Sequence, residues 1–194
     1  MMVQPAETTA SRAQIATLTM NPALDITTSV DTVRPTDKLR CGTTRYDPGG
    51  GGINVARVAH VLGGSVSAVF PAGGPTGDLV MSLLGDSAVP YRPVAIAGAT
   101  RESFTVNENS SGQQYRFVLP GPRLTFAEQA QCLDQLRIAA ESAEFVVVSG
   151  SLPPGVPPYY YQRVAEMCRQ LDARLILDTS GGGLQHIILR GVSA

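Results

Sequence analysis

The chain has 194 residues, of which 43% are apolar and 16% charged, and its formal net charge is −1. This composition is typical of a sizeable globular domain, and the near-zero charge gives no reason to expect a nucleic acid or an anionic membrane as partner. No apolar run reaches the roughly 18 residues that a membrane-spanning helix needs. Three widely spaced cysteines, Cys41, Cys132 and Cys168, fit neither a disulfide framework nor a zinc site and favour a cytoplasmic location.

Residues 1–14 are polar and lack the apolar segment of a secretion signal, so we interpret them as a disordered leader. The domain, residues 15–194, is expected to begin with a strand, because segment 15–20 is short and alternating. Asn21-Pro22 ends this predicted strand, and Asp25 follows it closely.

Residues 26–46 lack a helical period and are predicted to form irregular strands. Within them Lys38 and Arg40 are two positions apart, so on a strand both side chains project from one face, with Leu39 opposite. Two cations on one face suit an anionic ligand, but they also suit an ordinary solvated edge strand that is guarded by charge.

Residues 47–57, with the sequence DPGGGGINVAR, contain four consecutive glycines, which allow a ligand to approach the backbone closely. The apolar spacing of Val55, Val58 and Leu62 predicts a helix directly after them. A helix N-terminus offers unpaired N–H groups to an oxygen-rich ligand, and Asn54 in the first turn can both donate and accept hydrogen bonds. The alternative is a tight turn before an ordinary helix.

The chain then alternates strands and helices, which implies right-handed βαβ crossovers and a mostly parallel sheet. A predicted hairpin at 103–119, just after Arg101, interrupts this alternation and is typical of a flap over a sheet edge. The remaining predicted elements are a strand at 65–70, a turn at 71–74, a helix at 76–84, a helix from the Thr125–Glu128 capping box to Ala140, a strand at 145–148, a helix at 161–171, a strand at 175–177 and a helix at 184–189.

Polar residues collect where the predicted strands end. Asp25, residues 149–151 and residues 178–180 each follow a strand, and ligands of open α/β sheets bind at that edge. The glycine loop faces the same edge, and the segments that carry Lys38, Arg40 and Arg101 can cover it. A carboxylate for hydroxyl groups, N–H donors for oxygen atoms and cations for a dianion together match a phosphorylated sugar. The sequence has neither a GxxxxGK[ST] nor a strand-linked GxGxxG nucleotide motif.

Four segments together resemble the PfkB family of carbohydrate kinases, and within it the sugar-phosphate branch. They are NPALD at 21–25, KLR at 38–40, PGGGGINVAR at 48–57 and SGSLPPG at 149–155. The resemblance runs in order over roughly residues 15–192. It implies a ribokinase-like three-layer α/β/α sandwich with a mostly parallel sheet and a small β-lid, formed by about 26–46 and 101–119, that commonly makes a homodimer contact.

By this resemblance, the substrate site has residues for the sugar and residues for its phosphate. The sugar side would be Asp25, Gly50, Gly51 and Asn54, and the phosphate side Lys38, Arg101 and Ser151, with Arg40 as a weaker candidate. The implied activity is ATP-dependent phosphorylation of a sugar phosphate, most simply fructose 6-phosphate to fructose 1,6-bisphosphate in glycolysis. The alternatives are 1-phosphofructokinase, tagatose-6-phosphate kinase, or a non-catalytic protein that binds a sugar phosphate.

The sequence departs from the family pattern in one respect. The family's Gly-Ala-Gly-Asp segment, with its catalytic aspartate, and its Lys-Pro-Asn-x-x-Glu segment, associated with ATP and Mg²⁺, are absent. We therefore expect the chain to correspond to the amino-terminal part of such a kinase, with ATP, Mg²⁺ and the catalytic aspartate belonging to the intact enzyme. The chain alone is expected to be inactive and to hold no metal site.

Overall fold

Five short parallel strands form the main sheet of the molecule, and the computed structural model describes residues 14–179. The sheet order is β5-β4-β1-β8-β9. The strands are β1 (Gln14–Leu18), β4 (Ser65–Ala72), β5 (Tyr91–Ala95), β8 (Phe145–Ser149) and β9 (Arg174–Asp178). Their apolar side chains point to both faces, as expected for a parallel sheet that is covered on both sides.

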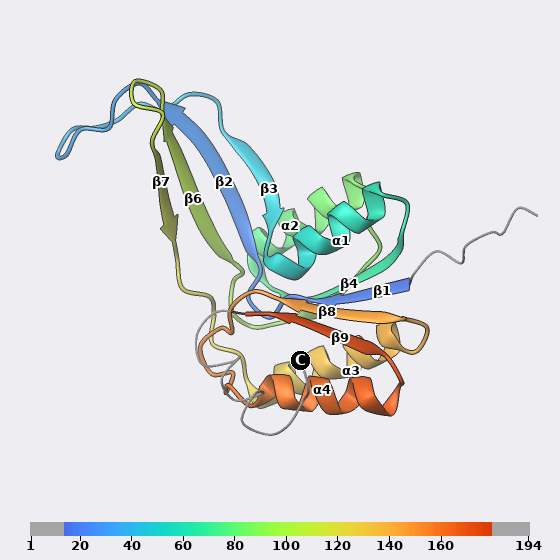
Figure 1. The fold of residues 1–194 in the computed structure, drawn as a ribbon. Helices are drawn as coiled ribbons and strands as arrows, with labels where there is room; N and C mark the ends of the chain where they lie inside the picture. The colour runs from blue at the N-terminus through green and yellow to red at the C-terminus, as the bar shows by residue number, and fades with distance from the viewer. Residues whose placement is uncertain (1–13, 180–194) are drawn as a thin grey trace, which may run out of the picture.

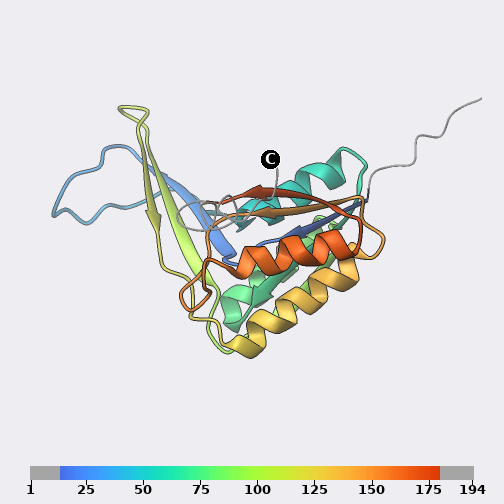
Figure 2. The same ribbon diagram turned by 60° about the horizontal axis from the view of Figure 1, so that its bottom comes forward.

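Two helices cover each face of the main sheet (Figure 1). Helices α1 (Gly51–Val61) and α2 (Gly74–Asp86) bury Ile53, Ala56, Val80 and Leu84 against one face, around Phe70. Helices α3 (Phe126–Ala140) and α4 (Tyr160–Gln170) lie side by side on the other face, as Figure 2 shows. Among the described helices, none is both long and apolar enough to cross a membrane.

A second, four-stranded sheet, called the small sheet here, projects from one end of the sandwich (Figure 1). Its order is β3-β2-β6-β7, with β2 (Ala23–Val30), β3 (Arg45–Gly49), β6 (Arg101–Glu108) and β7 (Gln114–Val118). Strands β2 and β6 are parallel, whereas β2–β3 and β6–β7 are antiparallel. The predicted fold class, an α/β sandwich with a mostly parallel sheet and a small added sheet, is confirmed.

The predicted capping box at the start of α3 is confirmed. The Glu128 N–H donates to Thr125 Oγ1 over 3.2 Å, and the Thr125 N–H donates to Glu128 Oε2 over 2.7 Å. Glu128 Oε1 also accepts the Ala97 N–H over 2.8 Å, which joins α3 to the end of β5. Burial acts to raise the pKa of Glu128, but the hydrogen bonds that its carboxylate accepts from the Thr125 N–H, the Ala97 N–H and Thr125 Oγ1, the last over 2.8 Å, outweigh burial and lower the pKa below its usual value.

Several predictions differ from the structure. Lys38 and Arg40 do not lie on a strand, because residues 31–44 form a turn and an irregular loop that is hydrogen-bonded to β2 only at Gly42, whose N–H donates to the Ser29 carbonyl oxygen over 2.9 Å. The expected turn at 71–74 is wrong in part, since β4 runs through Pro71 to Ala72 and α2 begins at Gly74. Strand β5 was not predicted; it is an edge strand of the described sheet and tolerates Pro93 for that reason.

Two interpretations fall on residues that the structure does not describe. The helix at 184–189 lies outside the described residues. The same holds for the leader at 1–14, except that Gln14, its last residue, begins β1.

Candidate functional site

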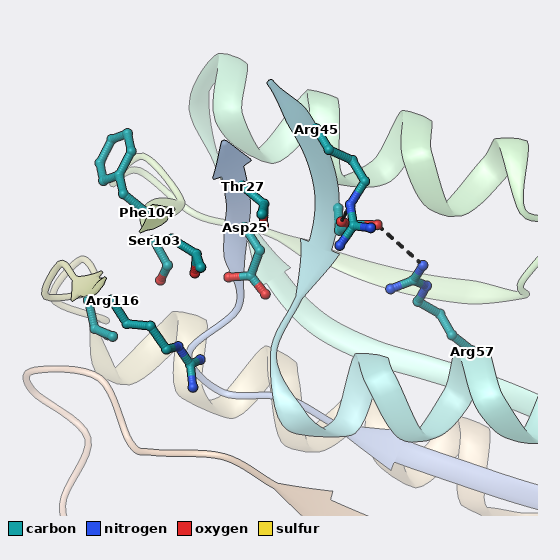
Figure 3. Close-up of a pocket in the computed structure, with 10 residues that line it drawn as sticks. Asp25, Thr27, Arg45, Arg57, Ser103, Phe104 and Arg116 are labelled. Carbon is teal, nitrogen blue, oxygen red and sulfur yellow. Dashed lines mark ion pairs between the residues drawn. The ribbon is translucent and has the colours of Figure 1, made fainter. Parts of the chain in front are cut away.

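One face of the small sheet is polar across all four strands because of the strand registers. Asp25 of β2 lies between Asp47 of β3 and Ser103 of β6. In the next row, Thr27 lies between Arg45 and Thr105, and Thr105 pairs with Arg116 of β7. These side chains line a cavity of about 450 Å³. Figure 3 shows Asp25 and Arg116 projecting into the same space.

Asp25 presents a half-buried carboxyl group to this cavity. Among residues 14–179 it has no hydrogen-bond or ion-pair partner, and burial raises its pKa, although Arg101 and Arg116 oppose the shift. Gly49 lies against it so closely that a Cβ there would be 2.3 Å from Asp25 Oδ2. A partly desolvated carboxylate without a partner is well suited to accept hydrogen bonds from ligand hydroxyl groups.

Three arginines surround the cavity, and only two of them are paired. Arg45 Nε lies 2.7 Å and Arg57 Nη2 lies 3.7 Å from the Asp47 carboxylate. Arg116 has no ion pair among the described residues, so its charge faces the cavity unneutralised. The sequence analysis missed Arg116; the alternation of Gln114, Arg116 and Val118 along the predicted hairpin indicates that they share one face, but the pairing of β6 with β2 decides that Asp25 lies on that face too.

The glycine loop brings α1 against the carboxyl ends of β1 and β8. Gly50 precedes the helix with φ = 120°, a conformation that favours glycine. A Cβ at Gly51 would lie 2.1 Å from Ser149 Oγ, and a Cβ at Gly52 would lie 2.6 Å from the Leu18 carbonyl oxygen. The first two N–H groups of the helix, on Gly51 and Gly52, have no partner within residues 14–179, whereas Ile53 donates to Thr19 Oγ1 over 2.8 Å.

Arg101 lies at the start of β6, on the same polar face as Asp25. Its guanidinium donates to three carbonyl oxygens: Asn21 at 3.1 Å, Leu119 at 3.1 Å and Pro22 at 3.4 Å. Burial lowers its pKa, and the nearby Asp25 opposes that shift. Because a guanidinium has five N–H groups, two remain for a ligand.

Ser151 follows β8 and accepts a hydrogen bond from Asn21 Nδ2 over 3.0 Å. Two residues earlier, Ser149 Oγ donates to Asp178 Oδ2 over 2.9 Å at the end of β9. The structure therefore joins Ser151 and Arg101 through Asn21, close to the carboxyl edge of the main sheet, as the sequence positions suggested.

Three other predicted site residues lie elsewhere. Lys38 and Arg40 border a cavity of about 530 Å³ within loop 31–44. Figure 1 shows this loop at the outer tip of the small sheet, remote from the main sheet. Asn54 is exposed on the first turn of α1 and borders a different cavity, together with Val58 and Val61.

Comparison with known proteins identifies the family of the chain. The model of the pfkB family of carbohydrate kinases matches residues 18–193. The chain belongs to the pfkB family of carbohydrate kinases. It is 69% identical over 186 residues to the ATP-dependent 6-phosphofructokinase isozyme 2 of Mycobacterium tuberculosis, covering 96% of this chain and 55% of that protein. It is 43% identical over 178 residues to the isozyme 2 of Escherichia coli, covering 92% and 57% respectively.

Solved structures of pfkB relatives share the fold. Phosphofructokinase-2 from Escherichia coli in complex with fructose-6-phosphate superposes with a TM-score of 0.87 at 42% identity, covering 92% of this chain and 59% of that one. A possible 1-phosphofructokinase from Thermotoga maritima superposes with a TM-score of 0.85 at 25% identity, covering 91% and 57%. The chain thus spans a little over half the length of the pfkB proteins that it matches.

Within residues 14–179, no three His, Cys, Asp or Glu side chains come together as metal ligands.

Proposed function

We propose that the chain binds fructose 6-phosphate, as the acceptor side of an ATP-dependent phosphofructokinase. The proposal rests on one observation. The Asp25 carboxylate and the Arg116 guanidinium border the same cavity, and neither has an ion-pair partner among residues 14–179. A sugar phosphate needs both: an acceptor for hydroxyl groups and a cation for a dianion.

The residues divide between the two ends of such a ligand. Asp25 accepts from the sugar hydroxyls, with the N–H groups of Gly51 and Gly52 nearby as donors. The two remaining N–H groups of Arg101, the Ser151 hydroxyl and the Arg116 guanidinium are the donors for the phosphate. The sequence suggested Lys38 and Arg40 for the phosphate. We propose Arg116 in their place, because Arg116 lines this cavity and Lys38 and Arg40 of the same chain line another.

In the whole enzyme, ATP and Mg²⁺ would supply the phosphoryl group and neutralise its charge, and the product would be fructose 1,6-bisphosphate in the cytoplasmic glycolytic pathway. Phosphoryl transfer depends almost wholly on positioning and charge stabilisation around the γ-phosphate. The chain lacks the segments that carry these functions in the family, so we expect it to bind the acceptor sugar without phosphorylating it.

The small sheet, in the role of a lid, also supports the proposal of a homodimer. The registers place Tyr46, Ile26, Phe104 and Phe117 in one row across the small sheet. Tyr46 is 46% and Phe117 55% exposed, whereas Ile26 packs against the sandwich core and Phe104 borders the cavity. Half-exposed aromatic rings on a projecting sheet suit a second copy of the chain. An E. coli relative has been described in a tetrameric inhibited form.

Isothermal titration calorimetry of the chain with fructose 6-phosphate tests the proposed function. We expect saturable binding that is stronger than for fructose, because fructose lacks the phosphate. Equal or tighter binding of fructose 1-phosphate or tagatose 6-phosphate would favour those substrates instead. Absence of binding of all three sugar phosphates would refute the proposal, and sustained ADP release by the purified chain with Mg-ATP would show that the catalytic machinery was misassigned.

A further inference from the structure

We propose that Asn21 is a positioning residue, which holds the Ser151 hydroxyl so that its hydrogen is free to donate to the substrate phosphate. The inference rests on the proposed function and adds a residue to it. Asn21 itself lies behind the residues that meet the ligand, since only 8% of its surface is exposed.

The sheet topology brings the two side chains together. Asn21 follows β1 and Ser151 follows β8, and these strands are parallel neighbours whose carboxyl ends lie side by side. Asn21 Nδ2 donates to Ser151 Oγ over 3.0 Å, although the residues are far apart in sequence. The Asn21 carbonyl oxygen also accepts from Arg101 Nη2 over 3.1 Å. One buried residue therefore contacts both the hydroxyl and the guanidinium of the phosphate side.

The direction of the hydrogen bond to Ser151 determines what Ser151 can offer. Because the Asn21 amide is the donor, it occupies a lone pair of Ser151 Oγ and leaves the hydroxyl hydrogen available. Accepting one hydrogen bond also polarises a hydroxyl group and strengthens it as a donor. Phosphate oxygens only accept, so the hydroxyl is presented in the form that a phosphate requires.

Asn21 carries a buried oxygen that is unpaired within the described chain, which lowers the stability of the fold and so argues against a purely structural role. Asn21 Oδ1 is buried and has no hydrogen-bond partner among the described residues. It lies against Gly121, where a Cβ would be only 2.1 Å away, so the loop fits closely over the amide. A buried acceptor without a donor lowers stability. Removing the amide loses the hydrogen bond to Ser151 but also removes this unpaired acceptor, so the two effects should offset and leave the stability of the fold nearly unchanged.

The test compares fructose 6-phosphate binding by the wild-type chain and two variants, using calorimetry. Asn21→Ala removes the donor and should weaken binding about two- to tenfold, the range expected for one hydrogen bond. Asn21→Asp keeps the size but accepts from the Ser151 hydroxyl and adds a negative charge, so it should weaken binding by about tenfold or more. Asn109→Asp makes the same change of charge in an exposed turn and should bind as the wild type does.

Three readouts separate positioning from general structural support. The melting temperature of Asn21→Ala should not fall, and its affinity for fructose, measured by NMR titration, should change less than about twofold, because fructose has no phosphate. In a Ser151→Ala background, Asn21→Ala should have no further effect, because its action passes through Ser151.

Each contrary result has a distinct meaning. Unchanged affinity of Asn21→Ala, an equal loss for fructose, or an undiminished loss in the Ser151→Ala background would overturn the role of Asn21 and leave the proposed function intact. A wild-type chain that does not bind fructose 6-phosphate would overturn the proposed function, and the role of Asn21 with it.

Discussion

Arg57 of α1 and Asp47 of β3 form an ion pair, with 3.7 Å between Nη2 and Oδ1, that ties the edge of the small sheet to the sandwich (Figure 3). Arg57 Nη1 also donates to the Pro48 carbonyl oxygen over 3.5 Å. Because both side chains are mostly shielded from water, the pair is screened less than an exposed one.

We expect Arg57→Ala to lower the free energy of unfolding by about 1 kcal/mol and to speed amide hydrogen exchange in β3. The control is Arg174→Ala, which removes a much more exposed ion pair to Glu144 of similar length, 3.5 Å, together with a contact of the guanidinium over the Phe145 ring, 5.6 Å from its centroid. Its effect should stay within about 0.5 kcal/mol. Urea unfolding with exchange mass spectrometry checks both, and equal effects of the two variants would contradict the prediction.

Arg116→Ala should weaken fructose 6-phosphate binding by about ten- to a hundredfold, since a charge-assisted contact contributes about 1.5–3 kcal/mol. Arg116→Lys keeps the charge and should recover part of the affinity. Arg92→Ala, an exposed arginine of β5 outside the cavity, should bind normally. Calorimetry at two salt concentrations checks the prediction: the wild-type affinity should fall with salt more steeply than that of Arg116→Ala.

Asp25→Asn should raise stability at neutral pH while it weakens sugar binding. Burial raises the pKa of Asp25 above its usual 3.8, so the native state holds this proton more tightly than the unfolded state does. The contribution of Asp25 to the free energy of unfolding is therefore complete below pH 3.8, and it is lost as the pH rises through the raised pKa of the native state. The melting temperature of Asp25→Asn should exceed that of the wild type at about pH 7, and the difference should vanish near about pH 3. An equal difference at both pH values would contradict this account.

Two glycine-to-alanine substitutions should have opposite effects. Gly51→Ala places a Cβ 2.1 Å from Ser149 Oγ, so it should displace α1 or Ser149 and cost about 1–3 kcal/mol. Gly85→Ala adds a methyl group in open space near the end of α2. It should raise the free energy of unfolding by about 0.5–1 kcal/mol, because alanine lowers the conformational entropy of the unfolded chain. Thermal unfolding of the two variants checks this, and destabilisation by both would mean that the backbone at Gly85 resists a side chain.

Local signals made much of this structure predictable. Four glycines before an apolar 3.6-residue period predict α1, the Thr125–Glu128 capping box predicts the start of α3, and the run at 145–148 predicts a buried strand. Each depends on neighbouring residues alone, and each is found.

Non-local contacts made the rest unpredictable. Arg116 and Asp25 border the same cavity only because β6 pairs with β2 on one side and with β7 on the other. The residues of either segment alone do not indicate the register of those pairs. Lys38 and Arg40 have strand-like spacing, but no strand passes beside them within the described chain. Strand β5 was not predicted because Pro93 argues against a strand with neighbours on both sides. In the described sheet β5 pairs only with β4, so the missing N–H of Pro93 is tolerated.

The parallel pairing of β2 with β6 has a consequence for how the chain folds. The whole unit α1-β4-α2-β5 lies between these strands in sequence, so their eight residue pairs cannot form until that unit has brought their ends together. Closing so long a loop is entropically costly, whereas the β6–β7 hairpin can form locally. We therefore expect the polar face of the small sheet to be assembled in the last kinetic phase of folding, after the sandwich core. Mutations in β2 should then accelerate unfolding and leave the rate of folding nearly unchanged.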